Sequence, residues 1–217
     1  MNGIAPPHSQ QTGLHPRLVE YVQRHLHSIS QRPVAEHTRQ AFAELSHSID
    51  PEQPLILDSG CGIGESTRQI ALQFPNAQVI GVDKSLHRLA RQPALPTHAR
   101  LLRAELADFW RLALASGWQL QRHYVLYPNP WPKSAQLMRR WHGSPLWPVI
   151  LALGGRLELR SNWRIYVEEW AQALAVAGIT ATVEPLRVDT PISPFERKYW
   201  AAGHALWGCV ADGRARE

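Results

Sequence analysis

The feature that most constrains this chain is a regular alternation of short apolar runs with amphipathic stretches between residues 54 and 178. Apolar runs bounded by glycine or acidic residues predict buried strands, and the stretches between them have the 3.6-residue period of helices. Strands that alternate with helices form βαβ units, in which helices cover both faces of a parallel sheet. The sequence therefore predicts an α/β fold. Strands are expected at residues 54–60, 77–83, 99–106, 123–130, 154–162, 179–188 and 204–211.

An N-terminal segment with a different pattern precedes this alternation. Residues 1–15 are expected to form a flexible arm, and residues 16–48 have the apolar periodicity of two helices. Proline residues then interrupt the chain before the first predicted strand. We therefore expect residues 1–50 to form an arm with two helices, and residues 51–217 to form the main domain.

Composition narrows the class of protein. The formal net charge of +5 permits a polyanionic partner such as a nucleic acid but does not require one. Cys61 and Cys209 lie far apart, which fits reduced thiols in the cytoplasm. The 11 histidines are scattered, so no metal site is expected. No apolar run approaches the length of a membrane span. We expect a cytoplasmic protein without a membrane partner, as a monomer or a weak homodimer.

A glycine-rich loop follows the first predicted strand. The stretch "LDSGCGIGES" carries Gly60, Gly62 and Gly64 between that strand and a helix. Glycines permit a tight turn and a close approach of the backbone to a ligand, and the helix N-terminus favours an anionic group. Asp83 ends the next strand, where a carboxylate can hold both hydroxyls of a ribose. The combination favours a nucleoside site over a turn that needs glycines for packing alone. The pattern of ATP-hydrolysing loops is absent.

The fourth predicted strand runs into a rigid aromatic loop, "YPNPWPK". Prolines have a fixed φ and restrict the residue before them, so Tyr127, Asn129 and Trp131 are expected in extended conformations. Asn129 can hydrogen-bond to the edge of a base, and Trp131 can stack on one. A rigid capping loop with a core tryptophan is the alternative. That alternative does not explain the cationic side chains that follow and that can meet phosphates, at Lys133, Arg139 and Arg140.

The order Asp-x-Gly-x-Gly-x-Gly, which starts at Asp58, resembles the class of S-adenosylmethionine-dependent methyltransferases. The resemblance implies a Rossmann-like, doubly wound sheet of seven mostly parallel strands with helices on both faces. It implies that the glycine loop contacts the methionine part of S-adenosylmethionine, and that Asp83 holds the ribose. An acid after the third strand often contacts the adenine, and Glu105 is the matching candidate, with Asp108 as a second possibility. The candidate cofactor-binding residues are therefore Asp58, Gly60, Gly62, Gly64, Asp83 and Glu105.

Three motifs in the same order narrow the resemblance. "YPNPWPKSAQLMRR" is similar to the Phe/Tyr-Pro-Asp-Pro-Trp-Pro-Lys motif and basic segment of the tRNA (guanine-N7-)-methyltransferases. "GGRLELRSNWRIYVEEW" is similar to that family's Gly-Gly, strand, Thr-Asp and tyrosine-bearing helix, and "TPISPFERKYWAAGHALW" to its Thr/Ser-x-Phe-Glu-Arg segment. The resemblance runs from about Leu55 to Trp207. It implies methyl transfer to guanine N7 in the variable loop of tRNA.

The resemblance also implies roles for individual residues. The acceptor base is expected at Asn129, Trp131 and Lys133. The residues expected around the RNA or the motif loop are Lys133, Arg139, Arg140, Asn162, Ser193, Glu196 and Arg197.

The chain departs from the family pattern at two acids, and its stretch "SAQLMRRW" is poorer in charge than the family's segment rich in histidine and lysine. Asn129 stands where the family has an aspartate between two prolines, and Asn162 where it has the aspartate of Thr-Asp. Each amide keeps the size and the hydrogen-bond acceptance of the acid but removes its negative charge. Guanine N7 carries a lone pair and no proton, so methylation there needs positioning and exclusion of water and no general base. Losing a carboxylate would remove part of the stabilisation of the cation that forms.

Two other interpretations remain open from the sequence. Asn-Pro-x-Trp also resembles the Asn/Asp-Pro-Pro-Tyr/Trp loop of enzymes that methylate exocyclic amines, in which case the acceptor is an adenine, a glutamine amide or a small amine. The segment Phe195-Glu196-Arg197 belongs to the guanine-N7 family and not to the amine-methylating one. The third interpretation is a catalytically silent relative that binds tRNA or the cofactor, which the two amides motivate and the intact glycine loop opposes.

Overall fold

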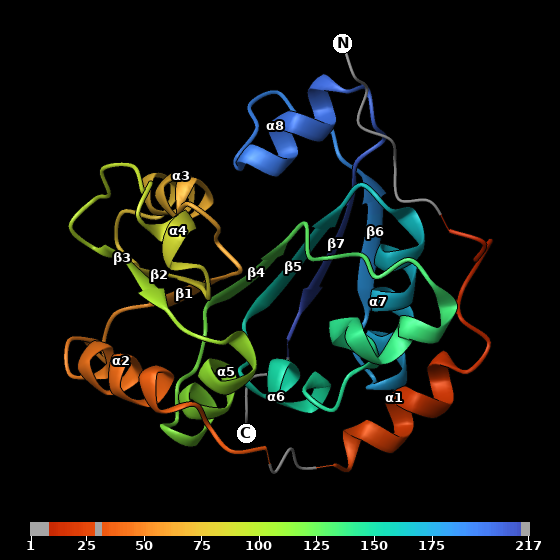
Figure 1. The fold of residues 1–217 in the computed structure, drawn as a ribbon, viewed down its shortest axis with the longest axis horizontal. Helices are drawn as coiled ribbons and strands as arrows, with labels where there is room; N and C mark the ends of the chain where they lie inside the picture. Colours follow the sequence, from red (N-terminus) through yellow and green to blue (C-terminus); the bar gives the residue numbers. More distant parts are fainter. Residues whose placement is uncertain (1–8, 29–31, 214–217) are drawn as a thin grey trace.

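The computed structural model describes residues 9–28 and 32–213, and a single sheet runs through its centre (Figure 1). The strands are β1 (Leu55–Ser59), β2 (Gln78–Asp83), β3 (Ala99–Arg103), β4 (Arg122–Leu126), β5 (Arg156–Ser161), β6 (Ala181–Pro185) and β7 (Trp207–Asp212). Their order is β3-β2-β1-β4-β5-β7-β6. Strands β1 to β5 are parallel, whereas β7 runs antiparallel to its neighbours β5 and β6. The predicted seven-stranded, mostly parallel sheet is confirmed.

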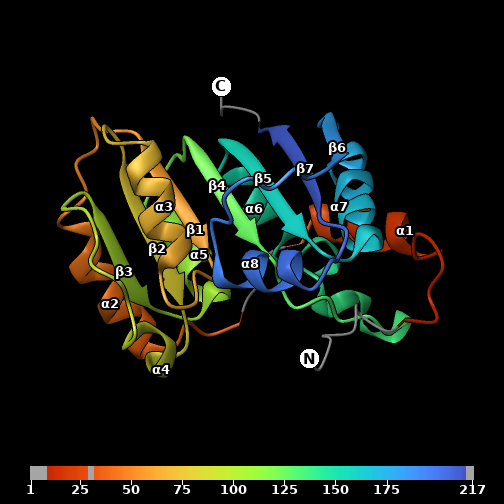
Figure 2. The same cartoon turned by 90° about the horizontal axis from the view of Figure 1, so that it is seen from above.

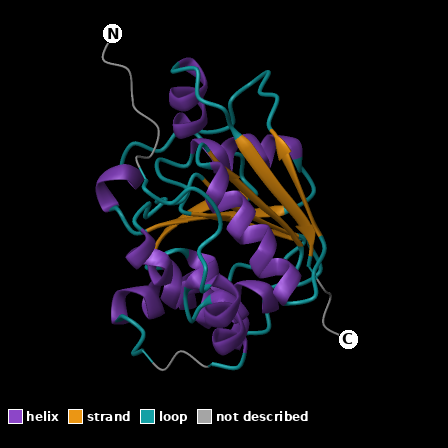
Figure 3. Cartoon of the chain, turned by 90° about the vertical axis from the view of Figure 1, so that its right-hand side faces the viewer, coloured by secondary structure: helices purple, strands orange, loops and turns teal. Residues whose placement is uncertain are grey.

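Helices pack on both faces of this sheet (Figure 2, Figure 3). The helices are α1 (Leu18–Leu26), α2 (Glu36–Ser46), α3 (Glu65–Gln73), α4 (Leu86–Leu89), α5 (Leu106–Ala115), α6 (Trp147–Ala152), α7 (Arg164–Val176) and α8 (Pro194–Ala201), with the 3-10 helices η1 (Ser134–Arg139) and η2 (Trp141–Gly143). Alternate residues of a strand point to opposite faces, so Leu55 and Leu57 enter a larger core and Ile56 a smaller one. Helices α1, α2, α5, α6 and α7 line the larger core, and α3 lines the smaller.

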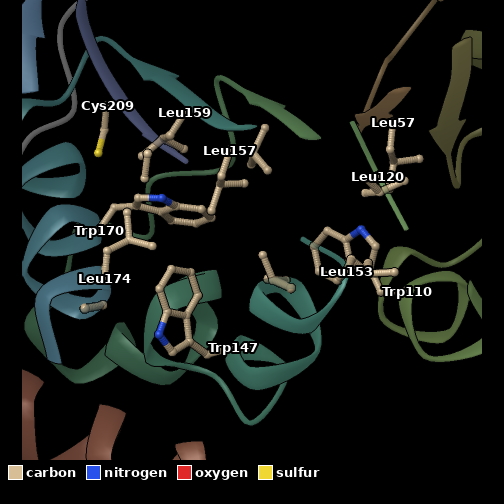
Figure 4. Close-up of a cluster of buried hydrophobic side chains, with 14 of the residues drawn as sticks. Leu57, Trp110, Leu120, Trp147, Leu153, Leu157, Leu159, Trp170, Leu174 and Cys209 are labelled. Carbon is tan, nitrogen blue, oxygen red and sulfur yellow. The ribbon is translucent and has the colours of Figure 1, made fainter. Parts of the chain in front are cut away.

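Tryptophan side chains fill much of the larger core (Figure 4). Trp110, Trp147 and Trp170 are fully buried. The rings of Trp147 and Trp170 meet edge to face, with their centroids 4.8 Å apart. Such pairs add about 0.5–1.5 kcal/mol to the free energy of burial. Because Trp147 lies on α6 and Trp170 on α7, this contact holds two helices together on one face of the sheet.

The N-terminal helices share the larger core with the sheet. Leu18 and Val22 of α1 and Phe42 and Leu45 of α2 are buried there. Helix α1 packs against α7, and α2 packs against α5. Residues on both sides of the expected boundary at residue 50 therefore contribute to one core.

The ends of several elements differ from the sequence prediction. Strand β3 stops at Arg103 because Glu105 is already the N-cap residue of α5. Strand β4 stops at Leu126 because Tyr127 has a positive φ, which a strand does not accommodate. Helices α6 and α8 were not predicted. Helix α8 is eight residues long and buries only Glu196, so it lacks the apolar stripe by which helices are recognised.

Candidate functional site

The candidate site lies at the carboxyl edge of the parallel strands. The strand order reverses between β1 and β4, because β2 lies on one side of β1 and β5 on the far side of β4. Ligands of open α/β sheets bind outside the carboxyl ends of the strands at such a switch point. The glycine loop (residues 60–64) follows β1, and the motif loop (residues 127–133) follows β4. The two loops singled out in the sequence thus leave neighbouring strands at the same edge.

The glycine loop has the backbone geometry that its residues predict. Gly60, Gly62 and Gly64 have φ values of 83°, 63° and 82°. Left-handed values of this size disfavour any residue with a side chain. A Cβ atom at Gly62 would meet nothing within 4 Å, whereas a Cβ atom at Gly64 would lie 2.4 Å from Leu101 Cδ1. Gly64 therefore also packs closely against the Leu101 side chain, while Gly62 leaves open space beside the loop. Cofactor binding by these glycines stays a prediction.

Asp58 lies next to the glycine loop, near the end of β1, and is buried. Its Oδ2 atom accepts hydrogen bonds from the hydroxyls of Ser66 and Thr67, at 2.6 and 2.7 Å. Its Oδ1 atom is buried without a hydrogen-bond partner among the described residues. Burial raises the pKa of this carboxyl to about 6, although the two hydroxyls act in the opposite direction. Since an unpaired buried oxygen costs free energy, the site fits a ligand with a donor group, such as an ammonium.

Asp83 ends β2, and its carboxylate is already hydrogen-bonded. Oδ2 accepts the backbone N–H of Gly62 at 3.0 Å, which ties the carboxylate to the glycine loop. Oδ1 accepts the N–H of Ser85 at 2.8 Å, and Nη2 of Arg88 lies 3.0 Å from the same oxygen. A ribose hydroxyl at Asp83 would therefore share Oδ1 with Arg88, a residue that the sequence reasoning did not single out.

The two acids considered for the adenine have different surroundings. Asp108 is buried, and its Oδ2 atom accepts the backbone N–H of Ala35 at 2.9 Å, which holds the start of α2. Glu105 is partly exposed, and its backbone N–H donates to Thr38 Oγ1 at 3.2 Å. Because the carboxylate of Asp108 has a structural partner, the geometry favours Glu105. Its contact with a ligand stays a prediction.

The motif loop was predicted to be extended at Tyr127, Asn129 and Trp131, but the structure differs. Tyr127 has a φ of 51° and Trp131 a φ of 45°, so that expectation was wrong for both. Hydrogen bonds outweigh the local preference for extended backbone before proline. The N–H of Tyr127 donates to the carbonyl of Arg160 at 2.8 Å, and the N–H of Trp131 donates to Asn129 Oδ1 at 3.3 Å. The Asn129 side chain therefore closes a turn within the loop.

The cationic residues after the motif loop fall into two groups. Lys133 and Arg139 are exposed, and the Arg139 guanidinium lies 4.8 Å from the centre of the Trp131 ring, in a cation–π contact. Arg140 is fully buried. Its guanidinium donates to the carbonyls of Trp131 and Lys133, and to Glu169 Oε2 at 2.5 Å. The prediction that Arg140 meets phosphates is therefore not supported, since this side chain holds the motif loop from inside.

Two of the residues predicted around the RNA or the motif loop hold α8 in place. Ser193 Oγ caps the helix by accepting the backbone N–H of Glu196 at 3.1 Å. Glu196 is buried, and its Oε1 atom accepts hydrogen bonds from Tyr127 Oη at 2.8 Å and from Arg160 at 2.9 Å. Because Tyr127 begins the motif loop, Glu196 joins α8 to that loop.

The other two predicted residues lie around the same helix. Arg197 forms an ion pair with Glu65, the first residue of α3. The Asn162 side-chain nitrogen lies 3.1 Å from His204 Nδ1, beside the turn that follows α8. Helix α8 therefore contacts both the helix that follows the glycine loop and the start of the motif loop.

Sequence reasoning missed Glu169, Gln11 and Arg88. Glu169 is the clearest omission, because it is fully buried on α7 between Tyr166 and Trp170. The sequence did contain a signal, which was an acid among the apolar positions of a helix. Because buried charges are usually paired, such an acid predicts a buried ion pair. The prediction that Tyr166 and Trp170 are core residues is confirmed.

The described residues contain neither a helix long and apolar enough to cross a membrane nor a group of three potential metal ligands.

Comparison with known families gives a match over most of the chain. A family model described as a putative methyltransferase matches residues 52–209. The chain is also similar to curated proteins named tRNA (guanine-N(7)-)-methyltransferase. The one from Burkholderia cenocepacia (strain HI2424) is 28% identical over 75% of this chain and 68% of the relative. The one from Acidovorax sp. (strain JS42) is 26% identical over 80% of this chain and 74% of the relative.

Solved structures with a similar fold are also methyltransferases. A structure described as an antibiotic-related methyltransferase has a TM-score of 0.59 at 15% identity, and covers 87% of this chain and 98% of its own. The 16S rRNA methyltransferase KamB has a TM-score of 0.56 at 17% identity, and covers 86% of this chain and 99% of its own. At these identities the likeness concerns the fold.

Proposed function

This chain belongs to the putative methyltransferase family whose model matches residues 52–209, and we propose that it transfers the methyl group of S-adenosylmethionine to N7 of a guanine in tRNA. The observation that carries the proposal is the motif loop, "YPNPWPK", which leaves β4 beside the glycine loop. The named relatives support the substrate, because proteins 26–28% identical to this chain carry the name tRNA (guanine-N(7)-)-methyltransferase. Following the resemblance, we assign the target to the variable loop.

The residues at the carboxyl edge fit S-adenosylmethionine. The buried, unpaired Oδ1 of Asp58 suits the ammonium group of the methionine part, and the open side of Gly62 leaves room for a ligand against the backbone. Asp83 would accept from the ribose, and Glu105 from the adenine amino group. When bound, the cofactor supplies a methyl group on a positively charged sulfur, which is ready for attack by a lone pair.

The work of the protein is then to position the guanine and to exclude water. In this proposal, Asn129 hydrogen-bonds to the edge of the base and Lys133 meets a phosphate. Trp131, whose ring Arg139 contacts through a cation–π interaction, stacks on the base. No proton has to be removed, because N7 attacks through its lone pair. The tRNA target would have to be unstacked to reach the site. We place this activity in the cytoplasm, in a monomer or a weak homodimer.

The test is to incubate the purified protein with methyl-labelled S-adenosylmethionine and bulk tRNA, and then to identify the modified nucleoside by mass spectrometry. We expect 7-methylguanosine. Asn129→Ala should lower the rate about a hundredfold, by analogy with the loss of one oriented catalytic group. Asn129→Asp, which restores the charge of the family motif and keeps the turn, should be at least as active as the parent chain.

Other products would distinguish the alternatives. Methylation of an exocyclic amine would move the assignment to the amine-type loop. No product, with S-adenosylmethionine still bound in calorimetry, would mean a different acceptor or a silent relative. No binding of S-adenosylmethionine would contradict the proposal altogether.

A further inference from the structure

The motif loop is held from inside by one buried guanidinium. Nε and Nη2 of Arg140 donate to the carbonyl of Trp131 at 3.2 and 3.1 Å, and Nη2 also reaches the carbonyl of Lys133 at 3.4 Å. These carbonyls belong to two of the residues assigned to the acceptor base. The guanidinium also lies 4.8 Å from the ring centre of Trp163, which fixes its plane.

Glu169 anchors this guanidinium and has hydrogen-bond partners from two segments of the chain, residues 11–15 and residues 140–142. Its Oε2 atom accepts from Arg140 at 2.5 Å and lies 3.0 Å from His142 Nε2. Its Oε1 atom accepts from Gln11 Nε2 at 2.6 Å and from the backbone N–H of His15 at 2.9 Å. Burial acts to raise the pKa of Glu169, but the hydrogen bonds and charges of His142 and Arg140 outweigh it and hold this pKa at about 2. The carboxylate therefore stays charged and paired.

Residues 1–15 were expected to form a flexible arm, and residues 1–8 lie outside the described residues. Residues 9–15, called the N-terminal arm below, supply two of the hydrogen bonds to Glu169. The amide of Gln11 bridges the buried ion pair, because Nε2 donates to Glu169 while Oε1 accepts from Arg140 Nη2 at 3.0 Å. Ser9 Oγ donates to the carbonyl of Pro132 at 2.6 Å, which is a direct contact with the motif loop. A groove between the arm and residues 132–135 runs along the same contact.

We propose that the N-terminal arm is a positioning element of the acceptor site, which sets the conformation of the motif loop through Gln11 and Ser9. The role rests on the proposed function, because the motif loop is assigned there to the acceptor base. The arm acts through Arg140 and the loop carbonyls and does not touch the reacting atoms. Positive φ values at Tyr127 and Trp131 make such support necessary, since non-glycine residues keep them only where surrounding contacts impose them.

The decisive variant is Ser9→Ala/Gln11→Ala, because both side chains are partly exposed and neither is a member of the Arg140–Glu169 ion pair. Gln10→Ala is the matched control, since Gln10 is an exposed neighbour on the same arm. Hydrogen exchange of the peptide spanning residues 126–140 reports on the loop without any reaction. We would also measure, for each variant, kcat with saturating tRNA, the Kd for S-adenosylmethionine and the Tm.

We expect faster exchange in the 126–140 peptide and a kcat lower by about tenfold, since small displacements of positioning groups are costly. The Kd for S-adenosylmethionine should stay within about twofold, because the glycine loop is not touched. Gln11→Glu, which places a second carboxylate against Glu169, should be worse than Gln11→Ala. Unchanged exchange and unchanged kcat in the double variant would overturn the inference.

Failure of the proposed function is recognised separately. If the parent chain makes no 7-methylguanosine, the substrate assignment fails, and the exchange measurement still decides the role of the arm. A lower Tm with unchanged exchange at 25 °C in the 126–140 peptide would count against the inference, because it would mean that the arm only adds stability.

Discussion

At the residue scale, protonation of the Asp58 carboxyl is expected to compete with binding of the cofactor. The pKa of its carboxyl is raised from 3.8 to about 6, so the folded chain holds this proton over a range in which the unfolded chain releases it. The group therefore favours folding below about pH 4, and this contribution is lost as the pH rises to about 6. An ammonium ligand would instead favour the deprotonated form of Asp58, because it pairs with the charged carboxylate.

The affinity for S-adenosylmethionine should accordingly fall as the pH drops below about 6, by up to tenfold per pH unit. Calorimetric titrations between pH 5 and pH 8 would measure it. In Asp58→Asn the affinity should be lower at neutral pH and nearly independent of pH, because no proton is exchanged at this position. The same pH dependence in the variant would show that another group binds the ammonium.

Arg88 presents a second test at the scale of one side chain. Its guanidinium lies 3.0 Å from Asp83 Oδ1, and its side chain is 38% exposed. Pairs of this exposure contribute about 0–1 kcal/mol, so Arg88→Ala should tighten binding of S-adenosylmethionine by up to about fivefold if the ribose competes for that oxygen. Arg91→Ala, at an exposed residue just after α4, is the control. Weaker binding in Arg88→Ala would mean that Arg88 itself contacts the cofactor.

At the scale of elements, the sequence predicts a feature well when the residues that determine it lie close together in the chain. The glycine loop was predictable because strand, left-handed glycines and helix follow one another within a few residues. The burial of Arg140 was not, because it depends on Glu169, which is 29 residues away and on another helix. The position of α8 likewise depends on the hydrogen bond that Tyr127 Oη donates to Glu196, a residue 69 positions away, and on no periodic pattern of its own.

The contact between α6 and α7 carries a prediction about stability. The Nε1 atom of Trp147 is buried without a hydrogen-bond partner among the described residues, so its ring acts as an apolar filler (Figure 4). Trp147→Phe keeps an aromatic ring against Trp170 and removes the unpaired N–H. We expect it to cost about 1–2 kcal/mol in the free energy of unfolding, against about 3–5 kcal/mol for Trp147→Ala.

Urea unfolding monitored by circular dichroism would measure both variants. The Kd for S-adenosylmethionine should not change in Trp147→Phe, because this residue lies in the core and not at the carboxyl edge. Equal losses of stability in the two variants would show that the indole nitrogen has a partner.

At the scale of the whole molecule, exposed cationic side chains lie at the carboxyl edge of the sheet. Exposed cationic residues that follow the carboxyl ends of strands include Lys84 after β2 and Lys133 after β4. At the opposite edge, Arg156 begins β5 and is paired with Asp212 at 3.2 Å. A polyanion should therefore be drawn to the edge that holds the glycine loop and the motif loop, and the net charge of +5 supports such attraction.

Binding of tRNA should consequently weaken as salt rises, and each phosphate contact should contribute about 0.7–0.9 to the slope of log K against log salt concentration. Lys133→Ala should reduce the slope by about that amount, because it removes one contact at the carboxyl edge. Arg156→Ala should leave the slope unchanged, although it alters the net charge equally. Fluorescence anisotropy with labelled tRNA at several salt concentrations would compare them. If Arg156→Ala reduced the slope and Lys133→Ala did not, the RNA would approach the opposite edge, and the assignment of the motif loop to the acceptor would have to be withdrawn.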